Sequence, residues 1–155
     1  MTYRMTGLDP ARFATLVGAS DRDLEEHGAR RVPVTTHPGF PCRITLDDAA
    51  PGEIMLLVNH LSVASGPYRA SHAIFVTEGA LAPATFQDEM PPALQSRVLS
   101  IRAFDRQDMM NDAALAQPGQ GDATVRKLFD NLAVVYIHAH NATRGCFAAA
   151  IERST

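Results

Sequence analysis

The chain has 155 residues and a formal net charge of −3, with 46% hydrophobic and 20% charged residues. This is the size and composition of one ordinary globular domain, large enough to bury a core without a disulfide or a metal ion. The slightly acidic balance provides no broad basic field, so we expect neither nucleic acid nor an anionic membrane surface as a partner. Arginine nevertheless far outnumbers lysine, and Lys127 is the only lysine. The arginines can therefore still form a local basic patch.

The lengths of the apolar runs predict where in the cell the protein is located. The N-terminal segment has no apolar stretch of signal-peptide length, and no run approaches the ~20 residues of a membrane span. We therefore expect a cytoplasmic protein. In that compartment Cys42 and Cys146 are expected to be free thiols.

The first part of the chain predicts short elements separated by turns. Residues 2–7 are expected to form a strand, and Asp9-Pro10 to begin a helix, because Asp caps helices and Pro suits the first turn. Ser20 is expected to begin a second short helix that ends at Gly28. Residues 30–35 read as an edge strand, because Pro33 lacks a donor. The prolines and glycine of residues 37–43 then predict a rigid loop.

The rest of the chain predicts mostly strands. Apolar or alternating runs indicate strands over residues 54–59, 71–77, 98–104, 133–140 and 146–151. Residues 61–70 and 105–121 are expected to be loops, the second with a turn of helix, and a helix is expected from Asp122 to Asn131. This succession favours a single α+β domain with a largely antiparallel β-sheet, a few short helices packed on it and a C-terminal β-hairpin.

Two histidines stand two residues apart near the end of the chain. In a strand, His138 and His140 share one face. Two neighbouring imidazoles can bind a metal ion or divide acid and base roles, and they can equally form a polar edge with local hydrogen bonds. A third metal ligand would have to come from His72, Cys146 or Asp112, and neither an HExxH nor a CxxC motif is present.

Four arginines lie beside turns or within strands rather than on helix faces: Arg43, Arg69, Arg102 and Arg144. A guanidinium inside a sheet needs an anionic partner. Arg102 is the sharpest case, because it interrupts the apolar run LSIRAF. It either pairs with an acid such as Asp105 or Asp112, or it binds the carboxylate or phosphate of a ligand.

The two cysteines carry a second possible chemistry. Cys42 and Cys146 both lie close to arginines in the sequence, and a nearby guanidinium favours the nucleophilic thiolate. The alternative is that each is simply a small buried residue. The chain contains no GxSxG elbow and no GxxxxGK phosphate loop, which disfavours nucleotide binding by that loop and serine hydrolysis by that elbow.

Five sequence blocks occur together and in order: PGFPCR (38–43), PYRASHAIFV (67–76), LSIRAFD (99–105), MMNDA (109–113) and YIHAHNATRGCF (136–147). With them the chain resembles a bacterial family catalogued as domain of unknown function 1203, over essentially its whole length. The resemblance implies no activity, but it implies that the candidate residues lie in the family's characteristic blocks. Phe147 stands where similar sequences carry Tyr. His60 falls in a loop that we expect to be variable, so it is not a candidate for the site.

The sequence thus favours one polar pocket, formed by Arg43, Arg69, His72, Arg102, His138, His140, Asn141 and Cys146. The leading hypothesis is an enzyme for a small anionic substrate, in which His138, His140 and Cys146 catalyse while the arginines, His72 and Asn141 bind the ligand. One alternative is a non-catalytic module that binds an anionic metabolite or a protein partner. Another is a metal protein that uses His138, His140 and His72. Cofactors and oligomeric state stay unknown.

Overall fold

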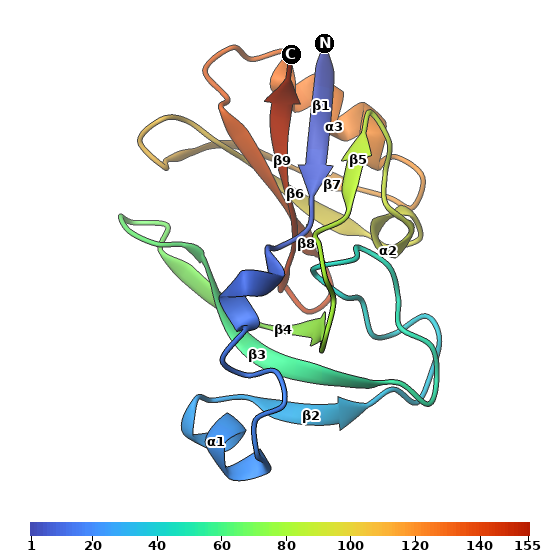
Figure 1. Cartoon of the computed structure of the whole chain (residues 1–155). Coiled ribbons are helices and arrows are strands. Elements are labelled where there is room, and N and C mark those ends of the chain that lie inside the picture. Colours follow the sequence, from blue (N-terminus) through green and yellow to red (C-terminus); the bar gives the residue numbers. More distant parts are fainter.

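Two antiparallel sheets make up the fold in the computed structural model, which describes residues 1–155 (Figure 1). Six strands in the order β5-β1-β9-β8-β6-β7 form the larger sheet, and three in the order β2-β3-β4 form the smaller one. All pairings between neighbouring strands are antiparallel. With its short helices and the β8–β9 hairpin, the structure confirms the predicted α+β class.

The larger sheet contains β1 (Thr2–Thr6), β5 (Thr85–Gln87), β6 (Leu99–Phe104), β7 (Met110–Ala116), β8 (Tyr136–Asn141) and β9 (Phe147–Ser154). The smaller sheet contains β2 (Arg30–Pro33), β3 (Ile54–Val63) and β4 (Ala70–Thr77). The helices are the 3-10 helix η1 (Pro10–Phe13) and the α-helices α1 (Asp21–Glu26), α2 (Pro92–Gln95) and α3 (Gly121–Phe129). Figure 1 shows the smaller sheet below the larger one, with both chain termini at the opposite end.

Both N-terminal helices begin at the predicted capping residues, and α1 also ends where Gly28 predicts. The Asp9 side chain accepts a hydrogen bond of 2.9 Å from the backbone N–H of Ala11, at the start of η1. The Ser20 hydroxyl accepts one of 3.1 Å from the N–H of Asp23, at the start of α1. Beyond α1, Gly28 has a φ of 68°, which a residue without Cβ adopts at little cost.

Strand β8 is buried on both of its faces. Ile137 and Ala139 belong to the core between the larger sheet and α3, which also contains Phe129. His138 and His140 point to the opposite face and are 7% and 2% exposed. The smaller sheet meets the larger one on this opposite side, because Phe147 of β9 packs in the core of the smaller sheet. The alternation of β8 therefore sends two imidazoles between the sheets.

Three segments differ from the sequence-based expectations. Residues 110–116, expected to be loop, form β7, which is an edge strand with few buried side chains and hence little apolar alternation. Strand β3 continues to Val63, through residues expected to begin a loop, because β4 pairs with it there. The short strand β5 was not expected at all, and its three residues pair with β1.

None of the helices has the length and apolarity needed to span a membrane.

Candidate functional site

Four histidines from three strands meet where the two sheets face each other, and we call His60, His72, His138 and His140 the histidine cluster. His60 of β3 and His72 of β4 are paired across their hairpin, while the other two lie on β8. The ring centroids of His72 and His140 are 5.0 Å apart, and those of His138 and His140 are 6.3 Å apart. The Phe147 ring lies 5.1 Å from both His60 and His138. The structure thus brings His72, His138 and His140 together across more than 60 residues of sequence.

The surroundings of the histidine cluster favour neutral imidazoles. Burial lowers the pKa of His60, His138 and His140 to about 4 in each case, and nearby positive charges add to this effect. Arg102 is one of these charges for His138 and His140. Burial, followed by Arg102 and Arg43, also lowers the pKa of His72. At neutral pH these rings can donate or accept a hydrogen bond without carrying charge.

The hydrogen bonds within the protein determine which ring nitrogens of the histidine cluster remain available to a ligand. Nδ1 of His140 lies 2.9 Å from the backbone oxygen of Gly145. Since a carbonyl only accepts, this contact places the proton on Nδ1 and leaves Nε2 with a lone pair. Nε2 of His72 and Nδ1 of His138 are buried without any hydrogen-bond partner. Unpartnered buried atoms of this kind are uncommon, and they often mark functional positions.

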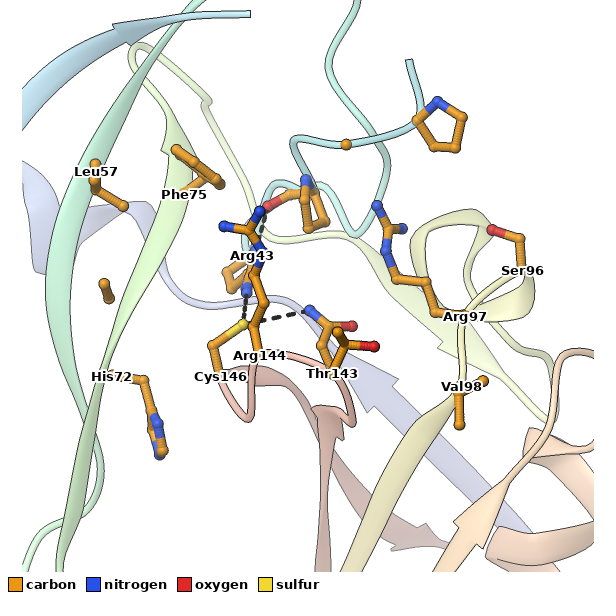
Figure 2. A pocket seen from close by; sticks show the side chains of 15 residues that line it. Arg43, Leu57, His72, Phe75, Ser96, Arg97, Val98, Thr143, Arg144 and Cys146 are labelled. Carbon is orange, nitrogen blue, oxygen red and sulfur yellow. Dashed lines mark hydrogen bonds between the residues drawn. The ribbon is translucent and has the colours of Figure 1, made fainter. Parts of the chain in front are cut away.

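A cleft of about 780 Å³ opens beside the histidine cluster (Figure 2). It is lined by Pro38, Gly39, Pro41, Arg43, Leu57, His72, Ala73, Phe75, Ser96, Arg97, Val98, Asn141, Thr143, Arg144 and Cys146. Figure 2 shows Leu57, Phe75 and His72 on one side and Ser96, Arg97 and Val98 on the other, with Arg43, Arg144 and Cys146 between them. Three arginines line this cleft and no acidic residue does.

Arg43 is the most deeply buried of these arginines, at 2% exposed. Its Nε donates to the backbone oxygen of Phe147 at 2.8 Å, and its Nη1 donates to that of Pro41 at 2.6 Å. It has no carboxylate within 4.0 Å, and burial lowers the pKa of its guanidinium. The backbone that carries it is held in place by Gly7, where a Cβ would lie 2.0 Å from the Ile44 oxygen. Arg43 is therefore a fixed, buried positive charge without a counterion.

Cys146 is in direct contact with Arg43. Nη2 of Arg43 lies 3.1 Å from the Cys146 sulfur (Figure 2). Nδ2 of Asn141 lies 3.5 Å from the same sulfur. Both nitrogens are donors, so the sulfur is the acceptor in both contacts. Cys42 lies elsewhere, buried, with its sulfur 3.2 Å from the backbone N–H of Thr77. Both cysteines are free thiols, as the sequence predicted.

The remaining arginines differ in how their charges are compensated. Arg97 forms a two-pronged ion pair with Asp48, with distances of 2.6 and 2.8 Å. Arg144 is exposed on the β8–β9 turn and makes no ion pair. Arg102 is half-buried, with Nε 3.2 Å from the Ser100 hydroxyl and no acid within 4.0 Å. Arg69 is exposed in the β3–β4 turn and does not line the cleft.

The structure does not gather all the expected residues around one cavity. Arg43, His72, Asn141 and Cys146 line the cleft, whereas Arg69 and Arg102 do not. His138 instead lines a smaller pocket of about 250 Å³, and His140 lines neither cavity. No group of three His, Cys, Asp or Glu side chains is arranged to hold a metal ion.

Sequence reasoning missed two members of the site. The sequence predicts a strand that ends at residue 59 and places His60 in a loop, but β3 continues through His60 and buries it. A continuation of the period-two pattern from Leu56 and Val58 to His60 is the signal that could have found it. No sequence pattern singles out Arg97, because it follows the very short helix α2 and reaches the cleft only through the packing of distant segments.

Comparison with known proteins adds a family assignment. No curated protein and no solved structure matches the chain. One family model matches residues 39–153, which include all the residues proposed for the site from the sequence. The chain therefore belongs to the family described as "Protein of unknown function (DUF1203)".

Proposed function

We propose that the cleft binds a small molecule through its carboxylate or phosphate group. The observation that carries this proposal is the uncompensated charge of Arg43. A buried guanidinium without an acid costs free energy, and a bound anion would offset that cost. Arg144 adds a second unpaired guanidinium to the lining, and no carboxylate competes there with a ligand. Planar guanidinium groups suit both carboxylate and phosphate oxygens.

The other lining residues fit the uncharged part of such a ligand. Leu57 and Phe75 are cross-strand neighbours that form an apolar wall. Asn141 and His72 each have one unpartnered buried atom, Oδ1 and Nε2, in side chains that line the cleft. Pockets for small molecules commonly combine apolar walls with a few polar groups in this way. Arg97 belongs to the wall, since Asp48 already neutralises its charge.

A second candidate function is covalent catalysis on the bound anion by Cys146. Its sulfur lies in the cleft, within hydrogen-bond distance of the Arg43 guanidinium and the Asn141 amide, so a nucleophilic side chain stands beside the bound ligand. Of the three histidines predicted from the sequence, His72 lines the same cleft and is placed to exchange a proton with a ligand. In this version the acid–base role falls on His72 rather than on His138 or His140.

Anion binding is tested by calorimetric titration with inorganic phosphate and with acetate. Arg144→Met should weaken binding about tenfold or more, since one charged hydrogen-bond partner is lost. Arg69→Met removes the same charge outside the cleft and should leave binding unchanged. Equal affinities for the wild type and both variants would contradict the proposal.

The catalytic version is tested by alkylation of Cys146 with iodoacetamide, followed by mass spectrometry of the modified peptide. We expect phosphate to slow the alkylation of Cys146, since sulfur and anion share the cleft. Asn141→Ala should also slow it, because one of the two donors to the sulfur is removed. If neither phosphate nor this substitution alters the rate, Cys146 is not the nucleophile of an anion-binding site.

A further inference from the structure

Strand β4 is the outermost strand of the smaller sheet, and only part of its free edge is covered. On the inner side it pairs with β3. On the outer side, Cys42 forms a parallel bridge with Phe75, and the N–H of Arg43 donates to the oxygen of Phe75 at 3.0 Å. The N–H of Thr77 is also used there, since it donates to the Cys42 sulfur at 3.2 Å. The 41–43 segment therefore occupies the edge at Phe75 and Thr77.

The same edge is open at the next residues along β4. Backbone groups in a strand alternate between its two sides, so the N–H and C=O of Ala73 and Ser71 point outward like those of Phe75. Neither residue makes an outward backbone hydrogen bond. Both are exposed, and Ala73 lines the cleft. The cleft thus contains an unpaired strand edge, which can accept another extended chain.

The free edge begins where the buried positive charge is held. Arg43 directly follows Cys42, the residue at which the covering segment bridges β4, and its guanidinium donates to the Cys146 sulfur in the cleft. Arg144 lines the same cleft. A chain paired with Ala73 would thus run with one end toward two guanidinium groups that have no acidic partner. Of the two ends of a peptide, the C-terminus carries the negative charge that these groups bind.

The wall of the cleft fits a side chain of such a peptide. Phe75 and Ala73 are two apart and share one face of β4, and Leu57 lies opposite Phe75 on β3. A strand added to β4 would place every second side chain over this apolar face. The cleft volume of about 780 Å³ lies within the usual range for small ligands, ~300–1,000 Å³.

From the open edge, the unpaired arginines and the apolar wall, we infer that the cleft binds the C-terminal carboxylate of a short extended peptide with an apolar residue near its end, paired along β4. This inference rests on the proposed anion binding and names the class of the ligand.

The test is a calorimetric titration of the full chain with three probes: acetyl-Gly-Ala-Val-Leu with a free carboxylate, the same peptide with a C-terminal amide, and inorganic phosphate. The acid should bind about tenfold or more tightly than the amide, because the charged hydrogen bonds are lost in the amide. Ser71→Pro removes an outward N–H of the same edge at a residue that does not line the cleft. It should weaken binding of the acid peptide while phosphate affinity stays unchanged.

A peptide with its Val–Leu amide nitrogen methylated provides a second measurement that needs no change in the protein. It should bind much more weakly than the parent acid, since it cannot donate to the β4 edge. If phosphate binds in an Arg144-dependent way while the acid peptide does not, or binds no better than the amide or methylated peptide, the peptide inference is wrong and the proposed function stands. If neither phosphate nor peptide binds, both are wrong.

Discussion

His138 is expected to make the stability of this protein sensitive to acid. Its ring is 7% exposed and packs against Phe104, Tyr136 and Phe147, with ring centroids 5.0 to 5.4 Å away. Burial, followed by the nearby His60 and Arg102, lowers its pKa from 6.5 to about 4. Between pH 6.5 and pH 4 the His138 imidazole is therefore protonated in the unfolded chain but neutral in the folded chain. The free energy of unfolding has its full value above pH 6.5 and falls as the pH drops toward 4.

The magnitude follows from the two pKa values. One pKa unit corresponds to about 1.4 kcal/mol, so His138 alone contributes a loss of roughly 3 kcal/mol by pH 4, of which about 2 kcal/mol has occurred at pH 5. His138→Phe removes this titration and also removes Nδ1, which has no hydrogen-bond partner. Such an atom costs ~1–3 kcal/mol when buried, so the variant should be at least as stable as wild type at pH 7.

The assay is urea unfolding followed by circular dichroism at pH 7 and pH 5. Between these two pH values the variant should lose about 2 kcal/mol less than the wild type, and the rest of the histidine cluster accounts for the loss that remains. His37→Gln is the matched control, since His37 is exposed, and it should follow the wild type. Equal losses in the wild type and His138→Phe would refute the burial argument.

Three further substitutions separate paired from unpaired charges and test the close approach at Gly7. Arg102→Met should change the free energy of unfolding by less than ~1 kcal/mol, because Arg102 has no acidic partner that the substitution would leave alone. A decrease of several kcal/mol in urea unfolding would reveal a structural ion pair. Arg97→Met should lower the free energy of unfolding by ~3–5 kcal/mol in the same assay, because the Asp48 carboxylate, whose side chain is 6% exposed, loses its guanidinium partner. A decrease below 1 kcal/mol would mean that water replaces this guanidinium. Gly7→Ala should lower the thermal midpoint by several degrees, because its Cβ would lie 2.0 Å from the Ile44 oxygen; an unchanged midpoint would show that this backbone can shift freely.

Local features of the sequence determined much of the fold. The capping residues Asp9 and Ser20 predicted the starts of η1 and α1, since a cap acts on backbone groups two or three residues away. The alternation in β6 correctly separated Leu99, Ile101 and Ala103 from Arg102, because neighbouring side chains in a strand point to opposite faces. The same rule placed His138 and His140 on one face of β8.

The tertiary structure decided which of these side chains form a site. The hydrogen bond between Arg43 and Cys146 joins residues 103 positions apart, and it exists only because the 41–43 segment packs beside the β8–β9 turn. Arg69 could not be told from Arg43 in the sequence, since both follow a proline-containing turn, yet one is exposed and the other is buried. The burial of each arginine depends on how the two sheets pack against each other. Residues far apart in the chain make that contact, so no local sequence pattern predicts it.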